Sequence, residues 1–329
     1  MNRKEQFLSY IRGENCNWMG YAFDAFPFPY PMVIDPVTAL DTQFSGESYV
    51  DLWGATWRHK DTDEGAIPMV NANNCVIKDL KHWRDFVKFP DLKNLDFTAA
   101  HEQIKAIDRE NQLLMIPGYY GPFERLHTLL PFEDTLIGLY EEPELISEII
   151  GALTDWRIEA FGYVIDELHP DIIHAHDDWG DASNLFCSPE IFRTYLKPHY
   201  KRLYSFIRSK GVLVQHHNDG FGRGLEEDMV DMGIDMWQGV LIQNDIPAMK
   251  QKTGKKLVYM GGLDQFKLDR CGGDPDVIRA EVRRCIDTYA PGGAFLPCYP
   301  SVMPLDMPTM FAVVEELNRY GAEWAEKNA

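Results

Sequence analysis

Basic residues are scarce in this chain. Its 32 lysines and arginines stand against 51 aspartates and glutamates, so the formal net charge is −19 at pH 7. A surface of that sign repels the phosphate backbone of nucleic acids, and no stretch rich in lysine or arginine offers a local exception. Nucleic acid is therefore not expected as a partner.

Long apolar runs are absent as well. The sequence has no run of about 18 apolar residues, which is the minimum for a membrane-spanning helix, and its start at residues 1–5 is too polar for a secretory signal. The six cysteines include no CxxC pair, a pattern that favours reduced, buried thiols over a disulfide framework. We expect a cytoplasmic protein without a membrane partner.

Several common catalytic motifs are missing. The sequence contains no GxxxxGK[ST], no GxGxxG after a predicted strand, no GxSxG and no HExxH. ATP binding by a P-loop, a Rossmann-bound nicotinamide and serine hydrolysis therefore lose support.

The chain does have a regular alternation of strand-length apolar runs and longer amphipathic stretches. This alternation predicts repeated βα units and a parallel sheet, and 329 residues suit one (β/α)8 barrel domain spanning 1–329. Six strands are expected at 113–117, 171–176, 212–216, 235–239, 257–261 and 294–298. A seventh is expected at 18–23, and 75–77 is the candidate for the eighth.

Two of the intervening helices have clear start signals. Asp274 and Pro275 supply an N-cap and a first-position proline for a helix that ends before 291–293. Ser188 opens another helix, within which Pro198 removes a backbone donor and predicts a kink or a division into two helices.

The first hundred residues contain a segment in which aromatic residues and prolines lie close together in sequence. Two interpretations stay open for this segment, 1–100: a lid that covers the substrate, or an aromatic-rich cap that closes the bottom of the barrel. In the first interpretation, Phe23 and Phe26 line the substrate pocket.

Polar side chains gather immediately after the predicted strands, where the loops of a parallel barrel form its catalytic face. Histidine, carboxylate and thiolate together make a plausible zinc set. His217 and Asp219 leave one strand end two residues apart, and Cys298 ends the last strand, so these three are candidate ligands. The alternative is that such histidines are hydrogen-bonded core residues and that the cysteine is a small buried hydrophobe.

An acidic pair adjoins two further histidines of this face. His174 and His176 alternate along a strand and therefore share a side, and Asp177 and Asp178 follow them. Asp178 is the candidate general base, cation partner or orienting group for His217. The alternative for the pair is an N-cap or a hydrogen-bond acceptor in the loop.

The order of motifs from about residue 118 to the C-terminus resembles the uroporphyrinogen decarboxylase superfamily, which includes corrinoid-dependent methyltransferases. The matching pieces include Gly121-Pro122-Phe123, Glu142-Pro143-Glu144-Leu145, Asp177-Asp178-Trp179-Gly180, Ser188-Pro189-Glu190, His217-Asn218-Asp219-Gly220 and Met260-Gly261-Gly262-Leu263-Asp264, preceded by Asp51-Leu52-Trp53-Gly54. The resemblance implies a (β/α)8 barrel with its active site at the carboxyl ends of the strands.

The chain departs from the superfamily's patterns at two places. The true decarboxylases carry an arginine-rich N-terminal motif that grips a tetrapyrrole, whereas residues 25–30 hold no arginine. The methyltransferases bind zinc through a His-x-Cys pair and a distant cysteine; His217 and Cys298 match, but Asp219 replaces the first cysteine. Porphyrinogen decarboxylation is not expected, and a Glu or His from another strand is an alternative third ligand.

The resemblance implies a zinc-dependent methyltransferase that moves a methyl group from a methyl ether, or a similar small donor, to the cobalt(I) of a corrinoid on a partner protein. In this hypothesis His217, Asp219 and Cys298 hold Zn²⁺, while His176 and Asp178 orient ligands or substrate. The expected substrate-binding residues are Tyr119, Tyr120, Trp179, Phe23 and Phe26. The alternatives are methyl transfer from a methylcorrinoid to a thiol, metal-independent decarboxylation of a non-porphyrin acid, and a non-catalytic barrel that binds a corrinoid or tetrapyrrole.

Overall fold

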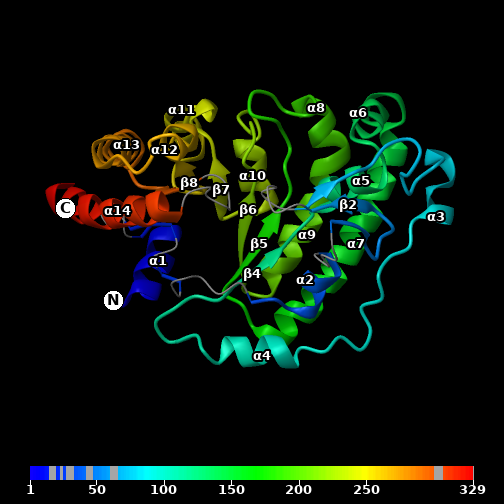
Figure 1. Ribbon diagram of the computed structural model, residues 1–329, viewed down its shortest axis with the longest axis horizontal. Coiled ribbons are helices and arrows are strands. Elements are labelled where there is room, and N and C mark those ends of the chain that lie inside the picture. Colours follow the sequence, from blue (N-terminus) through cyan, green and yellow to red (C-terminus); the bar gives the residue numbers. More distant parts are fainter. Residues whose placement is uncertain are drawn as a thin grey trace.

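The central element of the fold is a parallel sheet of six strands. The computed structural model describes residues 1–14, 20–22, 25–26, 33–41, 47–59, 66–299 and 307–328. The strands pair in sequence order, β4-β5-β6-β7-β8-β9, with helices around them (Figure 1). They are β4 (Met115–Gly118), β5 (Ile172–His176), β6 (Leu213–His217), β7 (Met236–Val240), β8 (Val258–Gly262) and β9 (Phe295–Cys298). All six predicted strands are confirmed, each starting one or two residues later than expected.

Helices connect each strand to the next. They are α5 (Pro122–Leu129), α6 (Phe132–Glu141) and α7 (Pro143–Leu168) after β4; α8 (Pro189–Ile191), the π-helix η2 (Phe192–Leu196) and α9 (Lys197–Ser209) after β5; α10 (Glu226–Met232) after β6; the 3₁₀ turn η3 (Ile242–Asn244) and α11 (Ile246–Thr253) after β7; α12 (Gln265–Asp269) and α13 (Pro275–Tyr289) after β8; and α14 (Met307–Asn328) after β9. Within the described part of the chain, no helix has the length and apolar character that crossing a membrane requires.

Both helix predictions are confirmed. The Asp274 carboxylate accepts hydrogen bonds from two backbone N–H groups of the first turn of α13. Ser188 caps α8 in the same way. The expected division near Pro198 takes the form of the π-helix η2, and this proline lies in the first turn of α9, which follows η2 directly.

Alternation along the strands separates an inner from an outer set of side chains. Met115, Ile172, Met236 and Leu296 belong to one core cluster, which also contains Phe7 of α1 (Arg3–Ile11). The residues next to them in sequence belong to the larger cluster formed with the surrounding helices. A parallel sheet whose two faces are both covered requires apolar side chains at consecutive positions, which is why these runs were readable as strands.

The N-terminal segment lies across the two outer strands of the sheet. The Ala22 N–H donates to the carbonyl of Pro297 in β9 at 3.3 Å, and the Ala25 carbonyl accepts from Leu113, just before β4, at 2.9 Å. These bonds connect β9 to β4, as closure of a barrel requires. Of the strand expected at 18–23, only 20–22 lie within the described residues, and they form no regular strand.

Two other expectations for the N-terminal part need correction. Residues 75–77 do not form a strand; the N–H groups of Val76 and Ile77 instead donate to the carbonyl of Leu129 at the end of α5. Phe26 packs edge-to-face on Phe7 in the inner cluster, next to the start of β4. It therefore lies at the amino ends of the strands, away from a pocket at their carboxyl ends. Phe23 lies outside the described residues.

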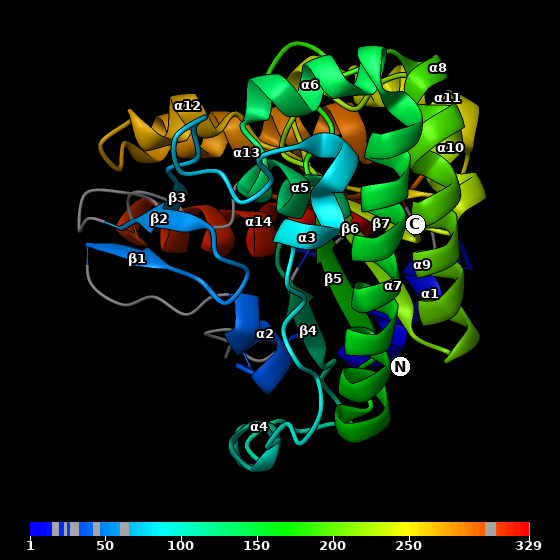
Figure 2. The same ribbon diagram turned by 90° about the vertical axis from the view of Figure 1, so that its right-hand side faces the viewer.

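A small antiparallel sheet stands beside the central one (Figure 2). It consists of β1 (Ser48–Val50), β2 (Thr56–Arg58) and β3 (Ile67–Pro68), and the same part of the chain contains α2 (Pro36–Asp41), η1 (Leu80–His82), α3 (Trp83–Phe86) and α4 (Thr98–Ile104). Asp51, after β1, forms a buried ion pair with Arg125 of α5 at 2.9 Å. The Trp57 ring of β2 lies 5.1 Å from that of Tyr120, just before α5. The small sheet is thereby fixed to the β4–α5 connection.

Candidate metal centre

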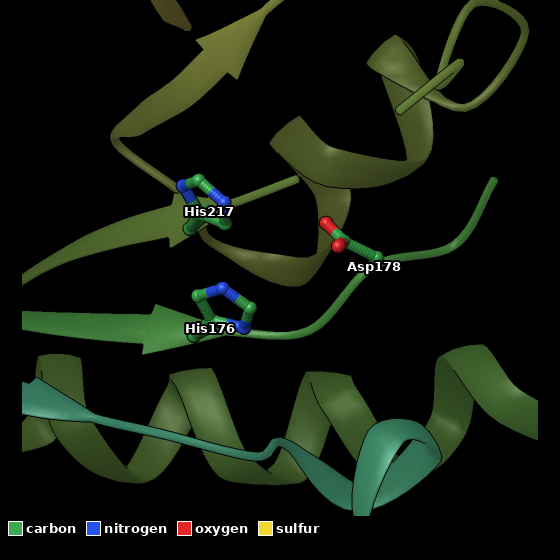
Figure 3. A group of neighbouring side chains, drawn as sticks. All are labelled: His176, Asp178 and His217. Atoms are coloured by element: carbon green, nitrogen blue, oxygen red, sulfur yellow. The ribbon is translucent and has the colours of Figure 1, made fainter. Parts of the chain in front are cut away.

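Three potential metal ligands converge at the carboxyl ends of β5 and β6. His176 and His217 are the last residues of these strands and stand opposite each other in the strand pairing, with their ring centroids 4.3 Å apart. Asp178 follows β5 by two residues. Ligand atoms of all three lie within 4.8 Å of one another (Figure 3). Parallel pairing in this register brings together side chains 41 residues apart in sequence.

A second group orients each imidazole. His217 Nδ1 contacts the side-chain oxygen of Gln238 on the neighbouring strand β7, and His176 Nδ1 lies 2.7 Å from a carboxylate oxygen of Glu124 in the first turn of α5. Because both partner oxygens are acceptors, each Nδ1 donates its proton, and each Nε2 is the nitrogen available to a metal.

The charges around the two histidines differ. Burial alone would lower the pKa of His176, but the carboxylates of Glu124, Asp178 and Asp219 raise it to about 10. Burial and the neighbouring histidines hold the pKa of His217 well below its ordinary value. Without a bound cation, His176 is therefore an imidazolium and His217 is neutral, and a metal ion must displace the His176 proton to bind there.

Asp178 is held towards the histidines by the loop after β6. One of its carboxylate oxygens accepts a hydrogen bond from the Asp219 N–H at 3.1 Å. Burial, and next the negative charge of Glu124, raise the pKa of Asp178 well above its ordinary range. A cation between these side chains would favour the ionised carboxylate and reverse this shift.

The ligand trio expected from the sequence is only partly brought together. His217 belongs to the cluster, whereas Asp219 and Cys298 are not members of it. An Asp219 oxygen lies 3.8 Å from His217 Nε2, and its side chain is 39% exposed. Cys298 is fully buried in the inner core cluster, and burial raises the pKa of its thiol to about 12. His176 and Asp178, expected to orient ligands, belong with His217 to the cluster that could hold a metal ion.

Besides Phe26, three expected substrate-binding residues lie in the described part of the chain, and they take different places. The half-buried Tyr119 ring lies 6.4 Å from that of His176. The Tyr120 ring lies against the Arg125 guanidinium and the small sheet. Trp179 is 3% exposed and stacks on His216 at 4.0 Å, among core aromatics. Of these three, Tyr119 is the residue that borders the candidate metal centre.

Comparison with known proteins adds family information to this geometry. Residues 60–297 match the family model described as uroporphyrinogen decarboxylase (URO-D). The chain is 35% identical over 120 residues to a uroporphyrinogen decarboxylase of Thermus thermophilus, covering 36% of this chain and 32% of that protein. It is 26% identical over 188 residues to that of Methylococcus capsulatus, covering 55% and 51%. The matched stretch thus spans about a third to a half of the length of these relatives.

A solved structure with the same fold is a methyltransferase from Methanosarcina mazei. The TM-score is 0.70 and the alignment covers 97% of this chain and 99% of that one, at 16% sequence identity. The similarity shows a shared α/β barrel-type fold over nearly the whole chain.

Proposed function

The chain belongs to the uroporphyrinogen decarboxylase family. We propose that it is a zinc-dependent methyltransferase whose zinc ion binds at the candidate metal centre. The methyl group would pass from a methyl ether, or a similar small donor, to the cobalt(I) of a corrinoid on a partner protein. The observation that carries this proposal is the convergence of His176, Asp178 and His217 at the carboxyl ends of two adjacent strands. We further propose a single cytoplasmic domain spanning 1–329.

The residues fit a catalytic zinc ion. Two imidazoles and one carboxylate are a known catalytic ligand set, which leaves a fourth position open. Both histidines have a Nδ1 partner, Glu124 for His176 and Gln238 for His217, as metal-binding histidines normally do. When bound, zinc would stabilise the negative charge that develops on the donor oxygen as the methyl group leaves.

The charges of the surrounding residues favour a neutral donor. Three carboxylates act on His176, those of Glu124, Asp178 and Asp219. With a divalent cation in place, they still disfavour a negatively charged substrate, because like charges repel at short range. These charges support a methyl ether over decarboxylation, which would require an acid as substrate.

The proposed reaction is a simple displacement. The carbon–oxygen bond breaks and its electron pair stays on oxygen, while cobalt(I) supplies the pair for the new cobalt–carbon bond. A proton from water then completes the alcohol or phenol. His176 and His217 would hold the metal, and the Tyr119 ring, beside His176, would border the donor.

Zinc content tests the proposal and separates the two possible ligand sets. We expect about one zinc ion per chain in the wild-type protein and almost none in His217→Ala. Loss in Asp178→Asn with retention in Cys298→Ser supports the triad of the structure. The reverse pattern supports the trio expected from sequence.

Turnover is the second part of the test. Zinc-loaded protein with reduced cobalamin and methyl ethers should form methylcobalamin, which is followed by its absorbance. A folded wild-type protein that takes up no zinc after reconstitution, or zinc-loaded protein that releases CO₂ from small acids but methylates no cobalamin, would refute the proposal.

A further inference from the structure

Asp177 lies between two candidate ligands in sequence but faces the other side of the barrel wall. His176 points towards the strand-end centre, so the next side chain points towards the surrounding helices. Asp177 is fully buried there. Its carboxylate accepts hydrogen bonds from the first turn of α5 and from the Tyr200 hydroxyl of α9.

The carboxylate of Asp177 caps α5 from another strand. The residue before this helix, Gly121, has no side chain that could cap it. Asp177 instead accepts from the N–H groups of Phe123 at 3.0 Å and Glu124 at 2.8 Å, two donors that have no partner within the helix. A Cβ atom on Gly121 would lie 2.3 Å from the Asp177 carboxylate. This close approach is the reason for a glycine at the position.

The same turn of α5 carries the residue that orients His176. The Glu124 backbone N–H donates the cap hydrogen bond to Asp177, and the Glu124 carboxylate lies 2.7 Å from His176 Nδ1. The N–H of Gly121 also donates to the His176 carbonyl at 2.6 Å. The backbone of Glu124 is therefore fixed relative to the strand that carries the imidazole it contacts.

We infer that Asp177 is a positioning residue of the metal centre: by capping α5, it holds Glu124 against His176 and so fixes the direction of His176 Nε2. This inference rests on the proposed metal-dependent function. Tyr200 supports the arrangement, because its hydroxyl donates to Asp177 and keeps the carboxylate in its place between α5 and α9.

A double-mutant cycle on zinc affinity tests the inference. Glu124→Gln should weaken zinc binding by about 10- to 100-fold, the usual effect of losing a group that orients a metal ligand. Asp177→Asn should weaken it in the same direction, because the amide supplies one acceptor oxygen where the carboxylate supplies two, and one of the two N–H groups of α5 then loses its partner. The double variant should bind zinc as weakly as Glu124→Gln alone, since Asp177 acts through Glu124.

Matched tyrosine variants control for general damage to the core. Tyr200→Phe removes a bond to Asp177, whereas Tyr204→Phe removes an equally buried hydroxyl of the same helix that contacts His216. We expect weaker zinc binding in the first and unchanged zinc binding in the second. Additive losses in the cycle, or an equal loss in Tyr204→Phe, would overturn the inference.

A metal-free measurement keeps this test separate from that of the proposed function. In zinc-free protein labelled with ¹⁵N-histidine, the Nδ1 resonance of His176 reports its bond to Glu124. We expect Asp177→Asn to move this resonance towards its position in Glu124→Gln, and Tyr204→Phe to leave it in place. If the wild-type protein binds no zinc, the proposed function fails while this readout still decides the role of Asp177. An unchanged resonance in Asp177→Asn refutes that role.

Discussion

Breaking the ion pair between Asp51 and Arg125 is expected to destabilise the chain strongly. The two side chains are 1% and 2% exposed and 2.9 Å apart. Asp51 also accepts from the Trp57 indole N–H, and the guanidinium lies 4.9 Å from the centres of the Trp53 and Tyr120 rings. Replacing one partner leaves the other as a buried, uncompensated charge. We therefore expect Arg125→Met to lower the free energy of unfolding by about 3–5 kcal/mol.

Urea denaturation followed by tryptophan fluorescence measures this loss. Arg84→Met is a matched control, because Arg84 also pairs with a carboxylate, Glu148, and lies over a tryptophan ring. Its side chain is 65% exposed, and exposed pairs contribute below about 1 kcal/mol. The double variant Arg125→Met/Asp51→Leu should be more stable than the sum of its single changes predicts. If Arg125→Met is no more damaging than Arg84→Met, the ion pair does not hold the small sheet to α5.

Three further outcomes are expected. Gly121→Ala should weaken zinc binding, because its Cβ would lie 2.3 Å from the Asp177 carboxylate. Gly162→Ala, whose Cβ would have its nearest contact at 3.5 Å, should leave zinc binding unchanged. Competition with a chelator in both variants checks this. Zinc affinity should rise by at least about tenfold per pH unit from about pH 6 to about pH 9, because binding at His176 releases a proton with a pKa of about 10 and the raised pKa of Asp178 adds to the proton release. Competition with a chelator measures the slope, and a flat profile contradicts this prediction. Cys298, fully buried and with its pKa raised to about 12, should resist iodoacetamide in native protein and react in urea, as peptide mass spectrometry would show.

The strands were predictable because of a simple physical requirement. A strand covered on both faces needs consecutive apolar residues, and all six runs of that kind after residue 110 became strands. The short run at 75–77 met the same criterion but pairs with the end of a helix. A run of apolar residues predicts that a segment is buried. It does not predict whether the backbone of that segment pairs with a strand or with the end of a helix.

The candidate site was less predictable, because its composition depends on register. The place of His217 at a strand end predicts a metal ligand, and the sequence predicts its partner two residues further along the same loop, at Asp219. The structure instead places His217 opposite His176 in the strand pairing, and a sequence does not reveal how two strands align. Cys298 ends its strand as expected, yet its side chain belongs to the inner core.

The orienting residues were missed for a related reason. Glu124 lies in the first turn of the helix after β4 and Gln238 lies within β7, so neither is near its histidine in sequence. A carboxylate in the first turn after a predicted strand is a usable signal, since that turn sits at the catalytic end of a parallel barrel. Gln238 offers no comparable signal, because nothing in a buried strand distinguishes a functional glutamine.

The alternation of one strand explains why neighbouring residues take opposite roles at this site. His176 faces the candidate metal centre and Asp177 faces the helices, so Asp177 and Asp178 take different places despite their shared chemistry, and Asp178 is the candidate that the sequence predicts. A substitution of Asp177 can thus alter the candidate metal centre without a direct contact, because the cap of α5 positions Glu124, and Glu124 accepts from His176 Nδ1. The coupling between Asp177 and Glu124 in the double-mutant cycle tests this reasoning directly. If Asp177 acts through Glu124, the double variant loses no more zinc affinity than Glu124→Gln alone, whereas two independent groups would give losses that add.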